Sequence, residues 1–269
     1  MKSDHPANLV PVMQSVAREA GTLLMGYFRQ RVKIEYKGDV DLVTVADRKS
    51  EALILERIRR EFPSHDVMGE EGTRIETGSD YKWYVDPLDG TTNFAHGYPC
   101  FAVSIGLMED GEPIAGVVFN PVAGELFSAA RGEGAYLNGK PIRVSSVEKL
   151  AHSLVATGFP THQRKRSANM EYYWEFTLRS HGVRRDGSAA LDLCSVACGR
   201  FDAFWEFRLN SWDTAAGVVL VREAGGAVTD LAGQSYRPGG FVMLASNGRV
   251  HEEMREIAAG IAERAAQNA

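Results

Sequence analysis

The stretch that decides the fold is Asp86-Pro87-Leu88-Asp89-Gly90-Thr91-Thr92-Asn93-Phe94, which directly follows the apolar run Trp83-Tyr84-Val85. The apolar run predicts a strand that continues into Asp86. Asp86 and Asp89 stand three residues apart, so their carboxylates can converge on one point with the carbonyl of Leu88 between them. Two carboxylates and a carbonyl form the hard oxygen set that suits Mg²⁺. The stretch therefore predicts a strand with a candidate cation site at its end.

The residues around this candidate site have local roles of their own. Pro87 is expected to end the strand or turn it, because proline lacks a backbone N–H and restricts the preceding residue. Gly90 lets the backbone approach a ligand closely. Thr91 and Thr92 are expected to begin a helix whose N–H groups face a phosphate. An Asp-Gly pair after Pro-Leu is also a common turn, so a purely structural turn stays open at this point.

The rest of the chain alternates between predicted helices and predicted strands. Hydrophobic periodicity and helix-capping residues predict helices over residues 7–30, 44–62, 188–198, 211–224 and 250–266. β-rich runs separated by turn residues predict an antiparallel meander within 101–146, and further strands at 201–206 and 241–245. This order predicts an α/β chain of mixed α+β layers. We expect a single domain over residues 1–269, with two closely packed halves, 1–145 and 146–269, as the alternative.

One segment of the meander nearly matches a phosphate-binding loop. The segment Gly134-Ala135-Tyr136-Leu137-Asn138-Gly139-Lys140 has the glycine and lysine spacing of a P-loop. Pro141 follows, however, where that motif needs Ser or Thr, and the segment lies between strands instead of between a strand and a helix. Asn138-Gly139 therefore predicts a hairpin turn.

The composition excludes several classes of protein. The chain has 269 residues, with 30 Lys and Arg against 35 Asp and Glu, so the formal net charge is −5. An acidic balance weighs against binding to nucleic acid or to a membrane surface. No apolar run is long enough to span a bilayer, and residues 1–5 lack the apolar core of a signal peptide. Three cysteines are too few for a disulfide framework, so a cytoplasmic location is the default expectation.

Three further acidic positions can join the candidate site, and each also has an ordinary structural explanation. Glu70, in Gly69-Glu70-Glu71-Gly72, fits a solvated acidic turn. Asp213 lies in the first turn of a predicted helix, where an acid gains about 0.3–1 kcal/mol from the helix dipole. Asp47 fits a capping box with Thr44. Their joint pattern, and not any one of them, points to a site.

That joint pattern resembles the inositol monophosphatase family, and the bacterial inositol-1-monophosphatase-like branch in particular. The resemblance extends from the first predicted helix to about residue 247. It implies the α-β-α-β-α layered sugar-phosphatase fold, a lithium-sensitive, Mg²⁺-dependent phosphatase and a homodimer. The motifs that carry it are Gly-Glu-Glu at 69–71, Asp-Pro-Leu-Asp-Gly-Thr-Thr-Asn-Phe at 86–94, Trp-Asp-Thr-Ala-Ala-Gly at 212–217 and Glu-Ala-Gly-Gly at 223–226.

The resemblance also implies roles for the residues at matching positions. Two or three Mg²⁺ ions would be held by the carboxylates of Glu70, Asp86, Asp89 and Asp213 and the carbonyl of Leu88. Asp47 and Thr91, together with Glu70, would act on the attacking water, which replaces the capping-box explanation of Asp47. The phosphate would be held by Gly90 and Thr91. The sugar or inositol ring would be contacted by Gly187, Ser188, Ala189 and Glu206.

The expected reaction is hydrolysis of myo-inositol monophosphate, or of a related polyol or sugar monophosphate, by an activated water. Relatives of this family hydrolyse fructose 1,6-bisphosphate, NADP, 3′-phosphoadenosine 5′-phosphate or histidinol phosphate, and these substrates stay open. Glu206 favours a polyol, because a carboxylate accepts hydrogen bonds from vicinal hydroxyls. The expected partner is therefore a small phosphate ester, with no nucleic acid and no membrane.

A different class of function also stays open, namely a scaffold that keeps the fold and acts by binding other proteins. A degenerate enzyme should have lost at least one metal ligand, and all four acids are present.

The negative net charge does not exclude a phosphate substrate, because three Mg²⁺ ions would bring +6 against the −4 of those four carboxylates.

Overall fold

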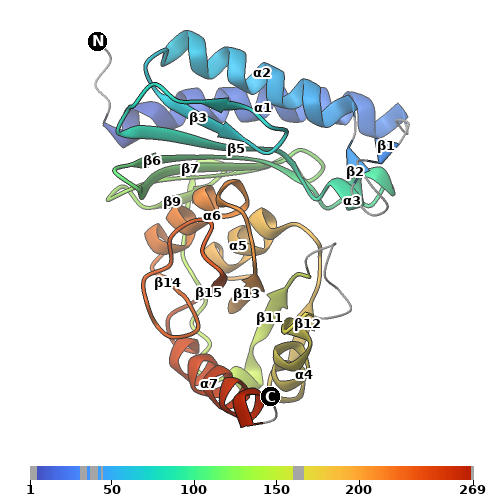
Figure 1. The fold of residues 1–269 in the computed structure, drawn as a ribbon, viewed down its shortest axis with the longest axis vertical. Helices are drawn as coiled ribbons and strands as arrows, with labels where there is room; N and C mark the ends of the chain where they lie inside the picture. The colour runs from blue at the N-terminus through green and yellow to red at the C-terminus, as the bar shows by residue number, and fades with distance from the viewer. Residues whose placement is uncertain (1–4, 31–34, 37–41, 44, 160–166, 268–269) are drawn as a thin grey trace.

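The computed structural model describes residues 5–30, 35–36, 42–43, 45–159 and 167–267. Helices and sheets alternate in five layers, from the α1–α2 pair to the α4–α7 pair (Figure 1). This arrangement confirms the predicted layered α/β fold. The helices are α1 (Pro6–Gln30), α2 (Val45–Glu61), α3 (Thr91–Ala95), α4 (Asn169–Arg179), α5 (Ala189–Ala197), α6 (Ser211–Glu223) and α7 (His251–Gln267), with a 3-10 turn at Leu150–His152.

The first sheet has eight strands in the order β10-β9-β8-β7-β6-β5-β3-β4. Strands β5 to β10 pair antiparallel with their sequence neighbours, which confirms the predicted meander, and β3 joins β5 in parallel. The strands are β3 (Asp66–Gly69), β4 (Arg74–Ile75), β5 (Tyr81–Asp89), β6 (Ala102–Glu109), β7 (Glu112–Asn120), β8 (Glu125–Ala130), β9 (Ala135–Leu137) and β10 (Lys140–Ile142). A separate two-stranded ribbon pairs β1 (Glu35–Tyr36) with β2 (Leu42–Val43).

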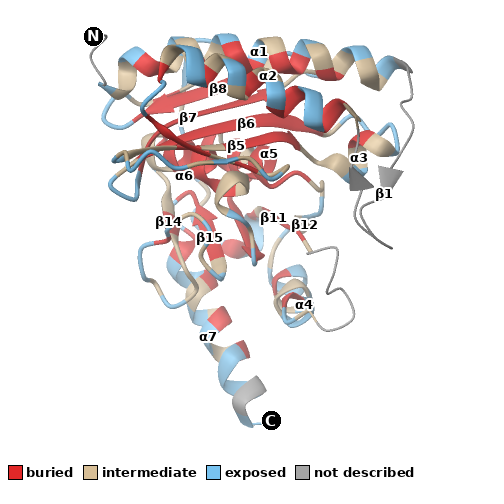
Figure 2. Ribbon diagram, turned by 45° about the horizontal axis from the view of Figure 1, so that its top comes forward, coloured by how far each residue is buried: buried red, intermediate tan, exposed pale blue. Residues whose placement is uncertain are grey.

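The helices α1 and α2 cover the outer face of this sheet (Figure 1). Helix α1 buries Leu9, Met13, Val16 and Leu24 at helical spacing, and these side chains pack in one cluster with Trp83 of β5. The central strands are buried over nearly their whole length (Figure 2). The end of β5 is therefore held on a rigid support.

The opposite face of the sheet is covered by α5 and α6, and two glycines allow α6 to lie unusually close. A Cβ on Gly116 would stand 2.5 Å from the carbonyl oxygen of Ala216, and one on Gly106 would stand 2.6 Å from Cβ of Ala215. These contacts fix the start of α6, which carries Asp213, against the sheet that carries Asp86.

The second sheet has five strands in the order β12-β11-β13-β15-β14, and α4 and α7 lie on its far side (Figure 1). Its central strand β13 pairs in parallel with β11 and antiparallel with β15. The fully buried Trp205 of β13 packs against Phe176 of α4 at 4.6 Å between ring centroids. The strands are β11 (Leu154–Thr157), β12 (Gly182–Arg184), β13 (Ala203–Phe207), β14 (Ala227–Thr229) and β15 (Val242–Ser246).

The prediction that Pro87 ends or turns the strand is wrong. Strand β5 continues to Asp89, and its pairing with β6 shifts register between the Asp86–Ser104 and Asp89–Ala102 pairs. Three steps along β5 match two along β6, so one extra residue forms a bulge. A proline is accommodated there because it need not donate to the ladder.

Other local predictions are confirmed, but several elements were omitted. Asn138-Gly139 forms the two-residue turn between β9 and β10, with φ of 49° and 76° as an Asn-Gly hairpin requires. The helix α4 was not predicted, nor were the strands β1, β2, β3, β4, β11, β12 and β14. Thr44, the proposed partner of Asp47 in a capping box, lies outside the described residues. Within those residues, no helix combines the length and apolar character needed to cross a membrane.

Candidate active site

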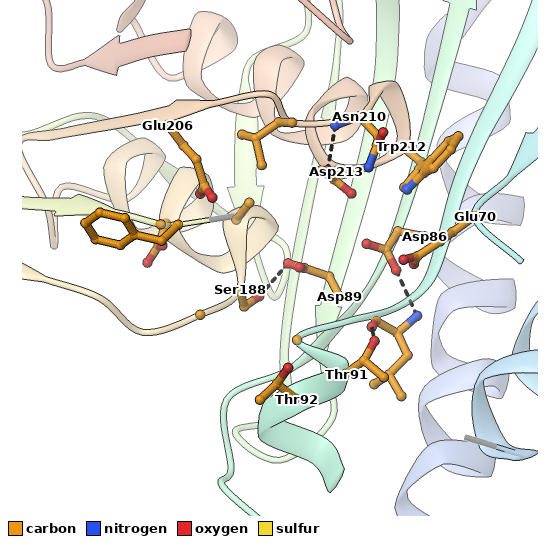
Figure 3. A pocket seen from close by; sticks show the side chains of 18 of the residues that line it. Glu70, Asp86, Asp89, Thr91, Thr92, Ser188, Glu206, Asn210, Trp212 and Asp213 are labelled. Carbon is orange, nitrogen blue, oxygen red and sulfur yellow. Dashed lines mark hydrogen bonds between the residues drawn. The ribbon is translucent and has the colours of Figure 1, made fainter. Parts of the chain in front are cut away.

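A cleft of about 400 Å³ opens between the two sheets, where the ends of β5 and β13 meet the starts of α3, α5 and α6 (Figure 3). Nearly all the residues expected at the site line this cleft. Asp47 does not line the cleft itself but contacts Thr91, which does. The predicted site residues that line the cleft are Glu70, Asp86, Leu88, Asp89, Gly90, Thr91, Gly187, Ser188, Ala189, Glu206 and Asp213.

The bulge in β5 presents the first carboxylate. Asp86 is 2% exposed, and its Oδ1 accepts a 3.0 Å hydrogen bond from the backbone N–H of Leu88. From α2, Ser50 Oγ donates a 2.9 Å hydrogen bond to the carbonyl of Pro87. The irregular backbone is thus held from both sides, which fixes the direction of the Asp86 side chain.

The second carboxylate, that of Asp89, is fixed by the start of α5. Its Oδ2 accepts hydrogen bonds from Ser188 Oγ at 2.5 Å and from the backbone N–H of Ala190 at 2.8 Å (Figure 3). Ser188 is also the N-cap of α5, as predicted, because its Oγ accepts from the N–H of Leu191 at 3.3 Å.

The third carboxylate, that of Asp213, comes from the first turn of α6. Its Oδ2 accepts a 2.7 Å hydrogen bond from the backbone N–H of Asn210, so the residue also caps its helix. The Asp213 carboxylate therefore both caps α6 and lines the candidate site. Figure 3 shows Asp213 directed toward the same space as Asp86 and Asp89.

Glu70, Glu71 and Asp47 form an acidic cluster at one end of the cleft. One ligand oxygen from each lies within 4.8 Å of the others, close enough to share a metal ion. The loop that carries Glu71 is fastened by Glu51 of α2, whose buried carboxylate accepts from the N–H of Glu71 at 2.8 Å and from Thr73 Oγ1 at 2.6 Å.

Sequence reasoning missed Glu51 and Ser50. Both lie on α2, three and four residues after Asp47, so all three side chains share one face of the helix. All three side chains are buried, with at most 4% of their surface exposed, although they are polar. That spacing of polar residues on an otherwise amphipathic helix was the available signal.

The hydroxyl of Thr91 lies between two candidate partners. Its Oγ1 stands 3.0 Å from the carbonyl oxygen of Leu88 and 3.5 Å from Oδ2 of Asp47. The shorter bond goes to Leu88, whose carbonyl keeps a second lone pair for another ligand. Asp47 is 1% exposed, so the Thr91 hydroxyl connects a buried carboxylate with the cleft.

Burial and mutual repulsion make the site strongly electronegative. Burial raises the pKa of Asp86 well above its ordinary value, and the charges of Glu70, Asp89 and Asp213 add to this. Burial likewise raises the pKa of Asp213. The pKa of Asp89 rises to about 6, because burial outweighs the hydrogen bonds from Ser188 and Ala190. These carboxylates need a cation nearby to stay ionised together at neutral pH.

Comparison with known proteins now decides the family. The model of the inositol monophosphatase family matches residues 5–268. The chain belongs to the inositol monophosphatase family. An inositol-1-monophosphatase of Synechocystis is 46% identical over 245 residues, which cover 89% of this chain and 85% of that protein. The structure of an inositol monophosphatase from Anabaena superimposes with a TM-score of 0.86 at 41% identity, covering 94% of this chain and 96% of that one.

A third relative carries a different name. The Nus factor SuhB of Pseudomonas aeruginosa is 46% identical over 226 residues, covering 81% of this chain and 83% of that protein. The family consists of phosphatases, so the chain is an enzyme of the phosphoric monoester hydrolase type, as the resemblance implied.

The acidic end of the cleft fits the divalent cation on which this family depends. The donors are carboxylate and carbonyl oxygens, which suit Mg²⁺ better than softer metals. Within the described residues, no Lys or Arg forms an ion pair with Asp86, Asp89 or Asp213. The charge of these acids is thus left for a ligand to balance.

Proposed function

We propose that this member of the inositol monophosphatase family hydrolyses the monophosphate ester of myo-inositol, and those of related polyols, with two or three Mg²⁺ ions. The observation that carries the proposal is the convergence of Asp86, Asp89 and Asp213 from three separate elements on one cleft, with Glu206 across from them (Figure 3).

In this proposal the metal is held by Glu70, Asp86, Asp89, Asp213 and the carbonyl of Leu88. When bound, Mg²⁺ supplies positive charge to the phosphate and leaving oxygens and lowers the pKa of a coordinated water. The protein contributes position: the hydrogen bonds to Asp86, Asp89 and Asp213 fix three oxygens before substrate arrives. Phosphoryl transfer depends chiefly on such positioning and on charge stabilisation.

We propose that Thr91 and Asp47 orient the attacking water and take its proton. The Thr91 hydroxyl lines the cleft and lies 3.5 Å from Asp47 Oδ2. A water that donates to Thr91 Oγ1 can pass a proton to this buried carboxylate through the hydroxyl. Gly90 and Thr91 border the same space and would hold the phosphate.

The leaving group would lie against Gly187, Ala189 and Glu206. Glu206 is 9% exposed, and its carboxylate lies directly over Gly158, where a Cβ would stand 2.1 Å from Oε2. Ser188 was also expected to contact the ring, but its hydroxyl donates to Asp89. We therefore propose that Ser188 positions the metal ligand and borders the substrate only through its backbone.

The test is release of phosphate from a panel of esters by the full chain. The panel would hold myo-inositol 1-phosphate, fructose 1,6-bisphosphate, NADP, 3′-phosphoadenosine 5′-phosphate and histidinol phosphate. Inositol phosphate should give the highest kcat/KM, EDTA should abolish turnover, and Li⁺ should inhibit it. Activity that ignores EDTA would overturn the mechanism, and a higher kcat/KM for another ester would replace the substrate.

The protein-binding alternative is favoured by one observation, the name of the Nus factor relative. It predicts a partner whose binding does not depend on the site. A pull-down compared between the wild-type chain and Asp86→Asn would separate the two functions, because a scaffold keeps its partner when turnover is lost.

The proposed homodimer and cytoplasmic location accompany the enzymatic proposal. One exposed apolar stripe is available for a subunit contact on α4, where Met170, Trp174 and Leu178 are 54%, 64% and 65% exposed at four-residue intervals. Light scattering after size exclusion would give the mass. Trp174→Glu should shift that mass toward the monomer if α4 forms the contact.

A further inference from the structure

The cleft contains a buried acid that no role above uses. Asp192 lies on the first turn of α5 and lines the cleft, although only 2% of its surface is exposed. Among the described residues, no group donates a hydrogen bond to its carboxylate, and Arg185 acts on it only through its charge. A buried carboxylate without a partner costs free energy. A ligand bound in the cleft can supply the missing hydrogen-bond donor.

Helix geometry explains why Asp192 faces the cleft. It lies three residues after Ala189, which also lines the cleft, so both side chains occupy the same face of α5. The hydrogen bonds from Ser188 and Ala190 to Asp89 fasten this end of the helix to the metal site. Asp192 is therefore held at a set distance from the reacting end of the cleft.

Glu206 approaches the same space from β13. It too is buried and lines the cleft, and within the described residues its carboxylate has no hydrogen-bond partner. Burial raises the pKa of Asp192, and the charges of Asp186 and Glu206 add to this, so the two acids of the cleft act on each other. The guanidinium of Arg185, at the exposed rim, opposes the rise for both acids. The cleft thus has two inward acceptors and one cation at its edge.

We propose that Asp192 is a specificity-determining residue which, together with Glu206, accepts hydrogen bonds from two hydroxyl groups of the leaving polyol. The proposal rests on the proposed function. It defines the substrate class as phosphate esters of cyclic or open polyols with at least two free hydroxyls. A carboxylate left unpaired in a filled cleft is penalised, so esters of alcohols without further hydroxyls are rejected.

The test compares kcat/KM for myo-inositol 1-phosphate with kcat/KM for phenyl phosphate, whose leaving group has no further hydroxyl. Asp192→Asn keeps the shape of the side chain but removes its charge and one acceptor oxygen. We expect the ratio of the two kcat/KM values to fall about ten- to hundredfold, the effect of losing a charged hydrogen bond. Asp110→Asn is the control, because Asp110 is an exposed turn residue outside the cleft, and it should leave the ratio unchanged.

The remaining outcomes are distinct. Equal loss on both substrates, or no change in the ratio, would overturn the role of Asp192. A wild-type chain that prefers phosphoethanolamine would show that the two acids bind an ammonium group, which also overturns it. A wild-type chain that hydrolyses neither ester would sink the proposed function itself, and this inference with it. Thermal unfolding checks that Asp192→Asn is folded, and Asp192→Glu, which keeps the carboxylate, should recover part of the ratio.

Discussion

Ser188 Oγ donates a 2.5 Å hydrogen bond to Asp89 Oδ2 across 99 positions of the chain. The same hydroxyl accepts from the N–H of Leu191 and so caps α5. One side chain therefore orients a candidate metal ligand and begins the helix that borders the leaving-group end of the cleft. The first sheet and α5 are thus coupled at the point where the chemistry is proposed.

Replacing Ser188 with alanine should weaken both functions of this hydroxyl. Loss of the N-cap should lower the free energy of unfolding by about 1 kcal/mol, measured by urea denaturation. Loss of the bond to Asp89 should raise the Mg²⁺ concentration for half-maximal activity by about tenfold or more. Ser188→Thr retains the hydroxyl and should recover most of both. Unchanged Mg²⁺ dependence in Ser188→Ala would show that Asp89 does not need this bond.

Asp86→Asn should abolish turnover and leave the fold intact, because it removes one charge from the cleft without changing the volume. We expect kcat to fall by at least about a hundredfold. The metal-free variant should unfold at a higher temperature than the metal-free wild type, since a repelling buried charge is gone. Asp110→Asn is the control, because Asp110 is an exposed turn residue with φ of 50°, which asparagine tolerates. Wild-type kcat in Asp86→Asn would refute the metal assignment.

The stabilising effect of Mg²⁺ should grow with pH. Burial and neighbouring charges raise the folded-state pKa of Asp86 and Asp213, and that of Asp89 rises from 3.8 to about 6. A raised pKa means that the folded state binds more protons than the unfolded state, so the metal-free fold loses stability as pH rises through these values. Bound Mg²⁺ removes that loss. The difference in Tm between samples with Mg²⁺ and with EDTA should therefore be larger at about pH 8 than at about pH 5, and a difference that does not vary with pH would contradict the site.

Glu51→Gln should act on the metal site from a distance. Its carboxylate fixes the N–H of Glu71 and the hydroxyl of Thr73, which hold the loop that carries Glu70. We expect the Mg²⁺ requirement to rise about 10- to 100-fold, with a smaller effect on kcat at saturating Mg²⁺. The exposed Glu56 of the same helix provides the matched control, Glu56→Gln. A fall in kcat that Mg²⁺ does not rescue would mean that Glu51 has some other role.

Gly116→Ala should force α6 away from the first sheet. Its Cβ would meet the backbone of Ala216 at 2.5 Å, and backbone atoms cannot move aside as a flexible side chain can. We expect a loss of about 1–3 kcal/mol in the free energy of unfolding. Gly26→Ala, on an open part of α1 with nothing within 4 Å, should instead gain about 0.5–1 kcal/mol. Urea denaturation of both variants measures the contrast, and equal effects would mean that the close approach of α6 is unimportant.

Much of the fold could be predicted because its signals are local. The helices α1, α2, α5, α6 and α7 follow hydrophobic periodicity, and the meander follows alternation and turn residues such as Asn138-Gly139. The omission of α4 has a physical reason: Met170, Trp174 and Leu178 lie on its exposed side, so the apolar pattern does not mark a buried face. The continuation of β5 through Pro87 was missed because a bulge depends on pairing with β6.

By itself, the sequence determined the chemistry available to this protein, since a strand ending in Asp86 and Asp89, with further acids at 47, 70 and 213, supplies hard oxygen ligands wherever they meet. Only the tertiary structure decided that they do meet. The contact of α6 with Gly106 and Gly116 places the start of that helix against the sheet, and the bond from Ser188 to Asp89 joins the first sheet to the start of α5. The burial of Glu51 and Asp192 was decided in the same way. Burial and long-range hydrogen bonds are set by how the layers pack, and no local pattern in the chain encodes them.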